Sequence, residues 1–175
     1  FVKILKQRNF WGIALPRFLA DPTWGILSQW LPLYFGKVRH WKLNRFALLG
    51  LPFLAADFGS VFGGFVSMML QNRFRMSLIN ARRCAFTLGV FMMLFVGFVG
   101  FVENAYAALA LLCLAGFAHQ TLSVTVITMS TDLFRKNEVG TVAGMAGTCG
   151  NAGVLVFTLL MGGLLDIVGY TPFFI

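Results

Sequence analysis

Five long apolar stretches make up most of this chain, and they limit what it can fold into more than any motif does. The stretches cover about 10–36, 46–70, 84–102, 106–130 and 141–165, and a sixth begins near residue 170. Each is close to the roughly 20 apolar residues that a helix needs to cross a bilayer. The alternating ten-residue segments of a membrane β-barrel are absent. The sequence therefore predicts an all-α, polytopic membrane helix bundle.

The composition excludes an ordinary soluble domain. Of 175 residues, 58% are hydrophobic and only 11% are charged, and a soluble chain of this size has no means of burying so much apolar surface. The net charge of +8 does not indicate nucleic acid, because the basic residues lie in the connections between the apolar stretches. We therefore expect a lipid bilayer as the partner and no nucleic acid.

The distribution of basic residues predicts the orientation. Nine Lys and Arg residues lie before the first stretch and in the loops 71–83 and 132–140, whereas four lie on the opposite side, all within 37–45. Basic loops face the cytoplasm, so we expect a multi-pass inner-membrane protein with residue 1 and both former loops cytoplasmic. The sequence does not explain the basic 37–45 segment.

Motifs for catalysis, cofactors and metals are missing. The sequence contains no phosphate-binding loop, no H-E-x-x-H and no G-x-S-x-G. Cys84, Cys113 and Cys149 lie within or beside apolar stretches without a C-x-x-C pattern, and they are interpreted as packing residues. An intramembrane protease pair of Asp21 and Asp57 is disfavoured by the glycines around Asp57. Polar groups without a reactive centre favour binding and translocation, so we expect no enzyme, no cofactor and no metal.

The first apolar stretch contains charge and proline in its interior. Arg17 and Asp21 have the i,i+4 spacing of a helical ion pair, and Trp24 and Ser28 continue the same helix face. Pro22 is expected to break or kink the helix. Either the two charges only neutralise each other and fix the kink, or the stripe faces a cavity and contacts a substrate. Ionisable groups at membrane depth usually face a bundle interior, which favours the second reading.

Two further ionisable residues are candidates for a proton site or for a structural charge. Asp57 precedes a row of small residues, Gly59, Gly63 and Ser67, whose spacing allows close helix packing. His119 lies in the fourth stretch as a candidate proton carrier. A structural role is the alternative for both, and it is the favoured one.

The last two apolar stretches carry amides. Gln120 begins a face of the fourth stretch that includes Ser123 and Ile127, and its amide needs partners in a dry bundle. The fifth stretch has a glycine-rich face that includes Gly147, followed by Asn151. Asn151 serves either as an interhelical hydrogen bond or as a cavity-facing group.

Longer runs of sequence carry a family resemblance. They are 17–24 (RFLADPTW), 30–34 (WLPLY), 52–60 (PFLAADFGS), 63–67 (GGFVS), 118–120 (AHQ) and 132–144 (DLFRKNEVGTVAG). The chain resembles helices seven to eleven, and the start of twelve, of a major facilitator superfamily transporter. Within that superfamily it is similar to the hexuronate transporters of the anion:cation symporter branch.

The resemblance implies a fold and a function. It implies that the chain is the C-terminal half-domain of a twelve-helix transporter, and that the missing N-terminal half and protons are its partners. The implied activity is proton-coupled import of hexuronates such as glucuronate and galacturonate by alternating access. The alternatives are another organic anion, such as an aldonate or a dicarboxylate, or a non-transporting polytopic sensor. The expected substrate-binding residues are Arg17, Asp21, Trp24, Ser28, Gln120, Ser123, Ile127, Gly147 and Asn151.

Overall fold

The computed structural model describes residues 2–41 and 43–168, and within them the chain is helical and has no strand. The elements are α1 Val2–Leu5, α2 Arg8–Lys37, the 3₁₀ helix η1 Leu43–Gly50, α3 Leu51–Phe74, α4 Leu78–Val96, the 3₁₀ helix η2 Val99–Phe101, α5 Ala105–Leu133 and α6 Lys136–Val168. The prediction of an all-α membrane bundle is confirmed. The expected start of a sixth span lies outside the described residues.

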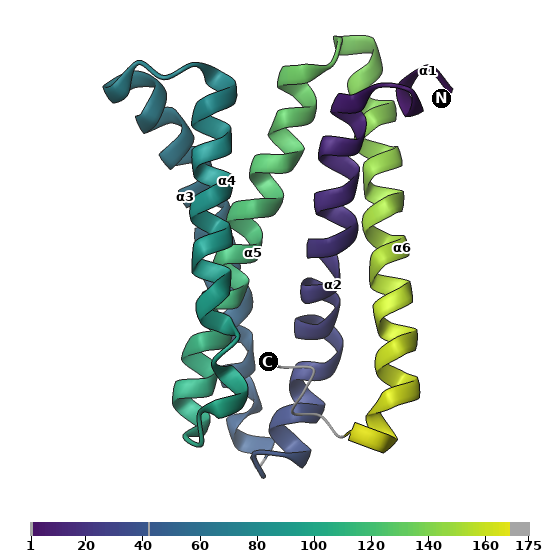
Figure 1. The fold of residues 1–175 in the computed structure, drawn as a ribbon. Coiled ribbons are helices and arrows are strands. Elements are labelled where there is room, and N and C mark those ends of the chain that lie inside the picture. The colour runs from purple at the N-terminus through teal and green to yellow at the C-terminus, as the bar shows by residue number, and fades with distance from the viewer. Residues whose placement is uncertain (1, 42, 169–175) are drawn as a thin grey trace.

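Four helical segments in the described part are long and apolar enough to cross a membrane. They are Ala47–Phe74, Leu78–Phe101, Ala105–Leu133 and Lys136–Leu164, and they overlap the second to fifth predicted stretches. The first predicted span, 10–36, forms the 30-residue helix α2, which is not among the four. Arg17, Asp21 and the prolines within α2 lower its mean hydropathy. Nevertheless, α2 lies side by side with α6 and also packs on α5 (Figure 1).

The expected break at Pro22 does not occur, because α2 continues through Pro16, Pro22 and Pro32. Proline has no N–H, so Pro22 leaves the Phe18 carbonyl without its usual intrahelical donor. Gly153 of α6 packs directly against this carbonyl, and a Cβ at residue 153 would collide with it. A glycine on the neighbouring helix therefore lies where the proline has exposed a backbone oxygen.

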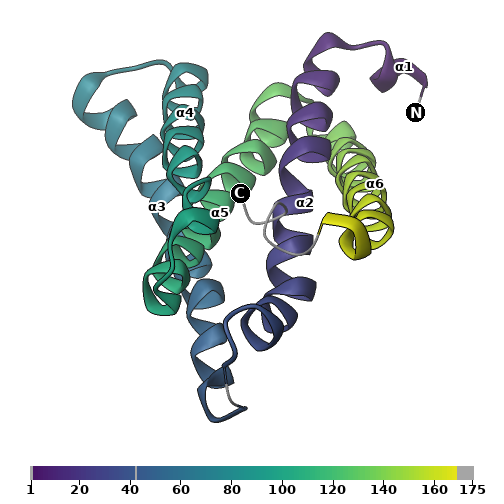
Figure 2. The same cartoon turned by 60° about the horizontal axis from the view of Figure 1, so that its bottom comes forward.

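The central helix of the arrangement is α5. Half of its apolar window is buried, against 17% to 28% for the other three spans. Figures 1 and 2 show α3 and α4 on one side of α5, while α2 and α6 lie on the other. Residues on α5 are therefore the ones most able to meet groups from several helices at once.

The row of small residues on α3 packs against α5, as its spacing predicts. Gly59 lies on the Phe117 carbonyl, where a Cβ would collide. Thr121 Oγ1 donates to the carbonyls of Gly59 at 3.0 Å and Phe117 at 2.9 Å. A second glycine, Gly116 on α5, faces the Pro52 carbonyl in the same way. The two backbones are thus in direct contact.

Helix α4 packs against α5 and α3. Ala81, Ala85 and Gly89 are buried at four-residue spacing, and a Cβ at Gly89 would press on Leu122 of α5. Arg82 Nε also contacts Asp132 Oδ2 of α5 at 3.1 Å. The rest of the helix carries many exposed apolar side chains. One face of α4 is therefore an interhelical contact.

The connections of the bundle lie at two opposite ends. The N-terminus, the α3–α4 connection and the α5–α6 connection share one end (Figure 1), where Lys3 pairs with Glu138 at 3.6 Å. At the other end Arg39 donates to the carbonyls of Val102 at 2.6 Å and Glu103 at 2.9 Å. Arg39 therefore binds free carbonyls after the α4 and η2 helices, which gives one basic residue of the 37–45 segment a structural role.

Candidate functional site

The charged residues of α2 form a pair, as their spacing predicts. Arg17 Nε donates to Asp21 Oδ2 at 3.1 Å, and Arg17 Nη2 forms an ion pair with the same oxygen at 3.0 Å. The side chains keep 20% and 16% of their surface exposed, so the pair is partly buried yet still reachable. Because both contacts go to one oxygen, the second oxygen of Asp21 is free for another partner.

Glycines of α6 make room for this pair. A Cβ added at Gly150 would collide with Asp21 Oδ2, and one added at Gly147 would lie 3.8 Å from Arg17 Nη1. The glycine-rich face of α6 therefore lies against the charged stripe of α2. Gly147 contributes space and backbone beside the guanidinium rather than a side chain.

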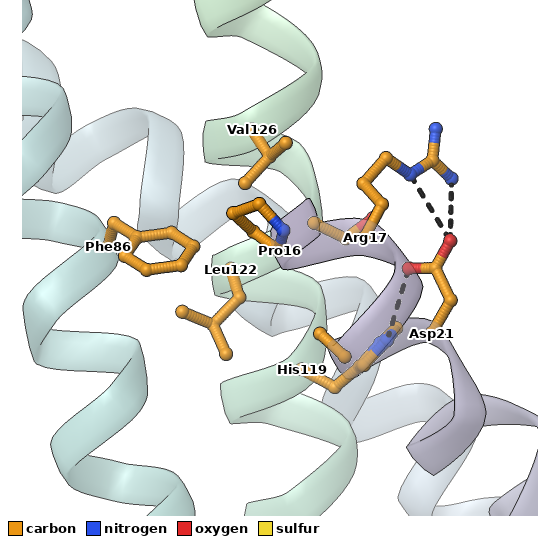
Figure 3. Close-up of a pocket in the computed structure, with 9 residues that line it drawn as sticks. Pro16, Arg17, Asp21, Phe86, His119, Leu122 and Val126 are labelled. Carbon is orange, nitrogen blue, oxygen red and sulfur yellow. Dashed lines mark hydrogen bonds and ion pairs between the residues drawn. The ribbon is translucent and has the colours of Figure 1, made fainter. Parts of the chain in front are cut away.

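His119 of α5 approaches the pair from the other side. Its Nε2 lies 3.9 Å from Asp21 Oδ1, as Figure 3 shows. The residue is 4% exposed, and neither ring nitrogen has a hydrogen-bond partner of good geometry among the described residues. Asp21 therefore lies between a guanidinium on its own helix and an imidazole on α5.

The indole ring of Trp24 stacks on one face of the His119 imidazole. The two rings stack with centroids 5.5 Å apart and an interplanar angle of 17°, and Phe53 of α3 contacts Trp24 edge-on at 5.4 Å. Stacking of this kind stabilises a defined ring orientation. One face of the indole is thus occupied by His119, which leaves less of it for a sugar ring.

A small cavity of about 10 Å³ lies beside the cluster, close to the volume that one water molecule needs. Its lining combines polar and apolar side chains from α2, α4 and α5 (Figure 3). The lining residues are Pro16, Arg17, Ala20, Asp21, Phe86, His119, Leu122, Ser123 and Val126. The structure thus brings Ser123 to the charged cluster.

The remaining predicted site residues do not line this cavity. Gln120 is half-buried, whereas Ser28, Ile127 and Asn151 are exposed. Gln120 and Ser123 are partly buried, and they share one stripe of α5 with the exposed Ile127. The exposed Ser28 hydroxyl donates to the Gly25 carbonyl at 3.2 Å. The predicted set is therefore divided into a closed cluster and an open polar surface.

Asp57 takes no part in this cluster. It is exposed on α3 in a stripe that includes Leu54, Phe58 and Val61, all of them exposed apolar residues. No hydrogen bond or ion pair of its carboxylate is found among the described residues.

Several contributors to the site were not predicted as site residues from the sequence. Gly150 shapes the space for Asp21, and five apolar residues line the cavity: Pro16, Ala20, Phe86, Leu122 and Val126. The Gly147–Gly150–Gly153 spacing was a usable signal for a helix contact, whereas nothing near Phe86 marks it as a lining residue.

Membrane-length helices packed around a charged cluster indicate a polytopic membrane protein with ionisable side chains inside its bundle. The sequence model of the Major Facilitator Superfamily matches residues 1–158. The chain belongs to this superfamily.

Curated relatives of this chain include transporters of sugar acids. The chain is 43% identical over 173 residues to a hexuronate transporter of Escherichia coli (strain K12) and to one of Escherichia coli O157:H7. It is 41% identical over 120 residues to a galacturonate transporter of Dickeya chrysanthemi. These matches cover 98% of the chain in the first two cases and 68% in the third. The predicted resemblance to the hexuronate transporters is confirmed.

The chain spans only part of those relatives. Its match covers 40% of each Escherichia coli protein and 34% of the Dickeya protein.

Proposed function

We propose that this chain is the C-terminal half-domain of a proton-coupled transporter that imports hexuronates, glucuronate and galacturonate among them. The names of the relatives and the share of their length that the chain matches support this assignment. In such a protein an N-terminal half completes the cavity, and access alternates between the two membrane faces.

The observation that carries the proposal is the environment of Arg17. The guanidinium lies beside the glycine face of α6, it is partly exposed, and its counter-ion is a neighbour on the same helix. A guanidinium matches a carboxylate in charge and in geometry. We infer that Arg17 pairs with Asp21 in the empty state and turns to the substrate carboxylate when a hexuronate is bound.

The same stripe of α5 supplies groups suited to the rest of a sugar acid. Gln120 and Ser123 offer donors and acceptors for ring hydroxyls, and they lie on the same helix as the cluster. Asn151 and Ser28 are further exposed polar groups on the flanking helices. In this proposal Ile127 and Trp24 form apolar walls, and Gly147 leaves room beside Arg17.

The N-terminus and two connections share one end of the bundle (Figure 1), which supports a common membrane side for all three. We propose that residue 1 and the loops 71–83 and 132–140 face the cytoplasm from the inner membrane, in agreement with their nine basic residues. The Lys3–Glu138 contact supports a common side for the N-terminus and the 132–140 loop.

Uptake by the full-length transporter tests the proposal. Vesicles with an imposed pH gradient should accumulate labelled glucuronate or galacturonate, and Arg17→Ala should abolish uptake while leaving the protein folded in the membrane. The matched control is Arg45→Ala, which removes an exposed arginine outside the cluster. Normal hexuronate uptake by Arg17→Ala would contradict the assigned role of this residue.

Competition separates the neighbouring substrate classes. An aldonate and a dicarboxylate present the same carboxylate to Arg17 without a pyranose ring. If either of them outcompetes both hexuronates, the substrate is that anion. If no anion is accumulated under any gradient, the sensor alternative replaces transport.

A further inference from the structure

His119 has no role in the substrate site proposed above, although it lies directly against it. The imidazole is 4% exposed, and neither ring nitrogen has a hydrogen-bond partner of good geometry among the described residues. The polar groups of α2 that face it are the Asp21 carboxylate and the Ala20 carbonyl. A buried polar side chain without a hydrogen bond is uncommon in native proteins, so the position needs an explanation.

A count of charge around Asp21 supplies one. In the empty state Arg17 and Asp21 balance each other, and a charged His119 would add an uncompensated positive charge to a mostly buried site. When Arg17 turns to a substrate carboxylate, one positive charge faces two negative ones. A proton on His119 restores the balance, because an ion buried without a counter-charge is strongly disfavoured.

We propose that His119 binds one proton together with each substrate anion, and that it thereby forms a proton site within this half of the transporter. The inference rests on the proposed function, since it requires Arg17 to exchange Asp21 for a substrate carboxylate. It assigns Asp21 a positioning role between its two cationic partners.

The geometry suits this exchange. Asp21 already uses Oδ2 for Arg17, while Oδ1 faces His119 Nε2 across 3.9 Å. This separation is too long for a hydrogen bond, and a shift of about 1 Å brings it into range. The shift becomes available when Arg17 releases Oδ2. Trp24 keeps the imidazole in a fixed plane by stacking, so the carboxylate is the group that moves.

Solvent delivers H⁺ to the free ring nitrogen of neutral His119, through the one-water cavity beside it, which gives an imidazolium with N–H groups at both nitrogens. The Nε2–H donates to Asp21 Oδ1 while the anion occupies Arg17. When the anion leaves, Arg17 returns to Asp21, and His119 loses the proton to solvent.

Among the described residues, only α2 places charged groups against His119. The charges that act on His119 are Asp21 and Arg17, both on α2. Phe86 of α4 lines the adjoining cavity, and α6 faces the carboxylate with Gly150. A pH effect located at His119 is therefore governed by the Arg17–Asp21 pair.

Proton counting on the purified full-length transporter tests the inference. Titration calorimetry with galacturonate in two buffers of different ionisation enthalpy gives the number of protons taken up per bound substrate. We expect His119→Gln to take up about one proton fewer than the wild type. Wild-type Kd should change by as much as tenfold more per pH unit than the Kd of His119→Gln, because binding and protonation are linked reciprocally. His40→Gln is the matched control, since His40 is exposed and distant from the cluster.

Asp21→Asn provides a second variant. The neutral amide removes the charge that the proton compensates, so the proton count should also drop by about one, and adding His119→Gln should change it no further. A wild-type proton count in His119→Gln, or in Asp21→Asn, would overturn the proposal. A purely structural role for His119 predicts weaker binding with an unchanged proton count.

A measurement on the wild type covers the case in which neither variant folds. Infrared difference spectra of protein with ¹⁵N-labelled imidazole rings should show imidazolium bands on addition of galacturonate, and their absence would overturn the inference. If the wild type takes up galacturonate but no histidine is protonated, only the His119 inference fails. A wild type that binds neither galacturonate nor glucuronate would overturn the proposed function and this inference together.

Discussion

Replacing Gly150 by alanine tests the way in which α6 accommodates the charged cluster. A Cβ at this residue would collide with Asp21 Oδ2, the oxygen that pairs with Arg17. Packed interiors do not absorb such an overlap without movement. Either the carboxylate moves by about 1 Å away from Arg17, or α6 moves away from α2.

The expected cost follows from the bonds that are displaced. A hydrogen bond to a charged group contributes about 1.5–3 kcal/mol when it is buried. Arg17 and Asp21 keep 20% and 16% of their side-chain surface exposed, and water screens that fraction of the interaction. Inserting a methyl group into a tight contact costs about 1–3 kcal/mol by itself. We therefore expect Gly150→Ala to lower the free energy of unfolding by about 2 kcal/mol.

Thermal melting of the full-length transporter in detergent provides the measurement. At about 2–4 °C per kcal/mol for large domains, Gly150→Ala should melt roughly 4–8 °C below the wild type. Gly144→Ala is the matched control, because it lies on the same helix and a Cβ there meets nothing within 4 Å. Alanine favours helix over glycine by about 1 kcal/mol, so the control should melt at or above the wild-type temperature.

A double-mutant cycle locates the source of any loss. Asp21→Ala removes the carboxylate with which the methyl group collides, so Gly150→Ala should cause little further loss in that background. A collision with the carboxylate is refuted if Gly150→Ala melts like Gly144→Ala, or if it lowers the melting temperature equally with and without Asp21.

Two further stability predictions use the same melting assay. Gly59→Ala should cost about 2 kcal/mol or more, because its Cβ collides with the backbone of α5, whereas Gly64→Ala on the same helix meets nothing within 4 Å and should be tolerated; equal melting of the two variants would contradict the α3–α5 contact. Arg39→Lys should cost about 1–3 kcal/mol, because one ammonium does not replace a guanidinium that serves several carbonyls. The exposed Arg45→Lys is its control, and equal effects of the two changes would show that Arg39 does not anchor its loop.

Contacts within one helix were predictable from the sequence. The Arg17–Asp21 pair follows from i,i+4 spacing alone, and the structure contains it. The apolar stretches gave four of the membrane-length helices because length and composition decide that property. The continuity of α2 at Pro22 was not predicted, because it depends on how α6 packs around the freed carbonyl.

The rows of small residues indicated which helix faces pack, but which side chains meet between helices could not be predicted from the sequence. Whether His119 meets Asp21 depends on the axial register and rotation of α5 against α2, and nothing local to either residue sets these. The Arg82–Asp132 pair could not be predicted for the same reason, because its two residues lie on different helices. Arg39 shows a related limit, because a basic residue in a loop has the same sequence signal whether it marks topology or binds carbonyls.

The charged cluster lies where three helices meet, and this affects how a bound anion can influence the bundle. On its α6 side Asp21 meets a glycine face, which has no side chains to interlock with α2. On its α5 side it meets a buried imidazole held by an aromatic stack. The contact with α6 is thus a close backbone packing, whereas the contact with α5 is electrostatic. Under the proposed function, a change of partner at Arg17 alters the electrostatic link between α2 and α5, while the glycine contacts keep α6 packed against α2.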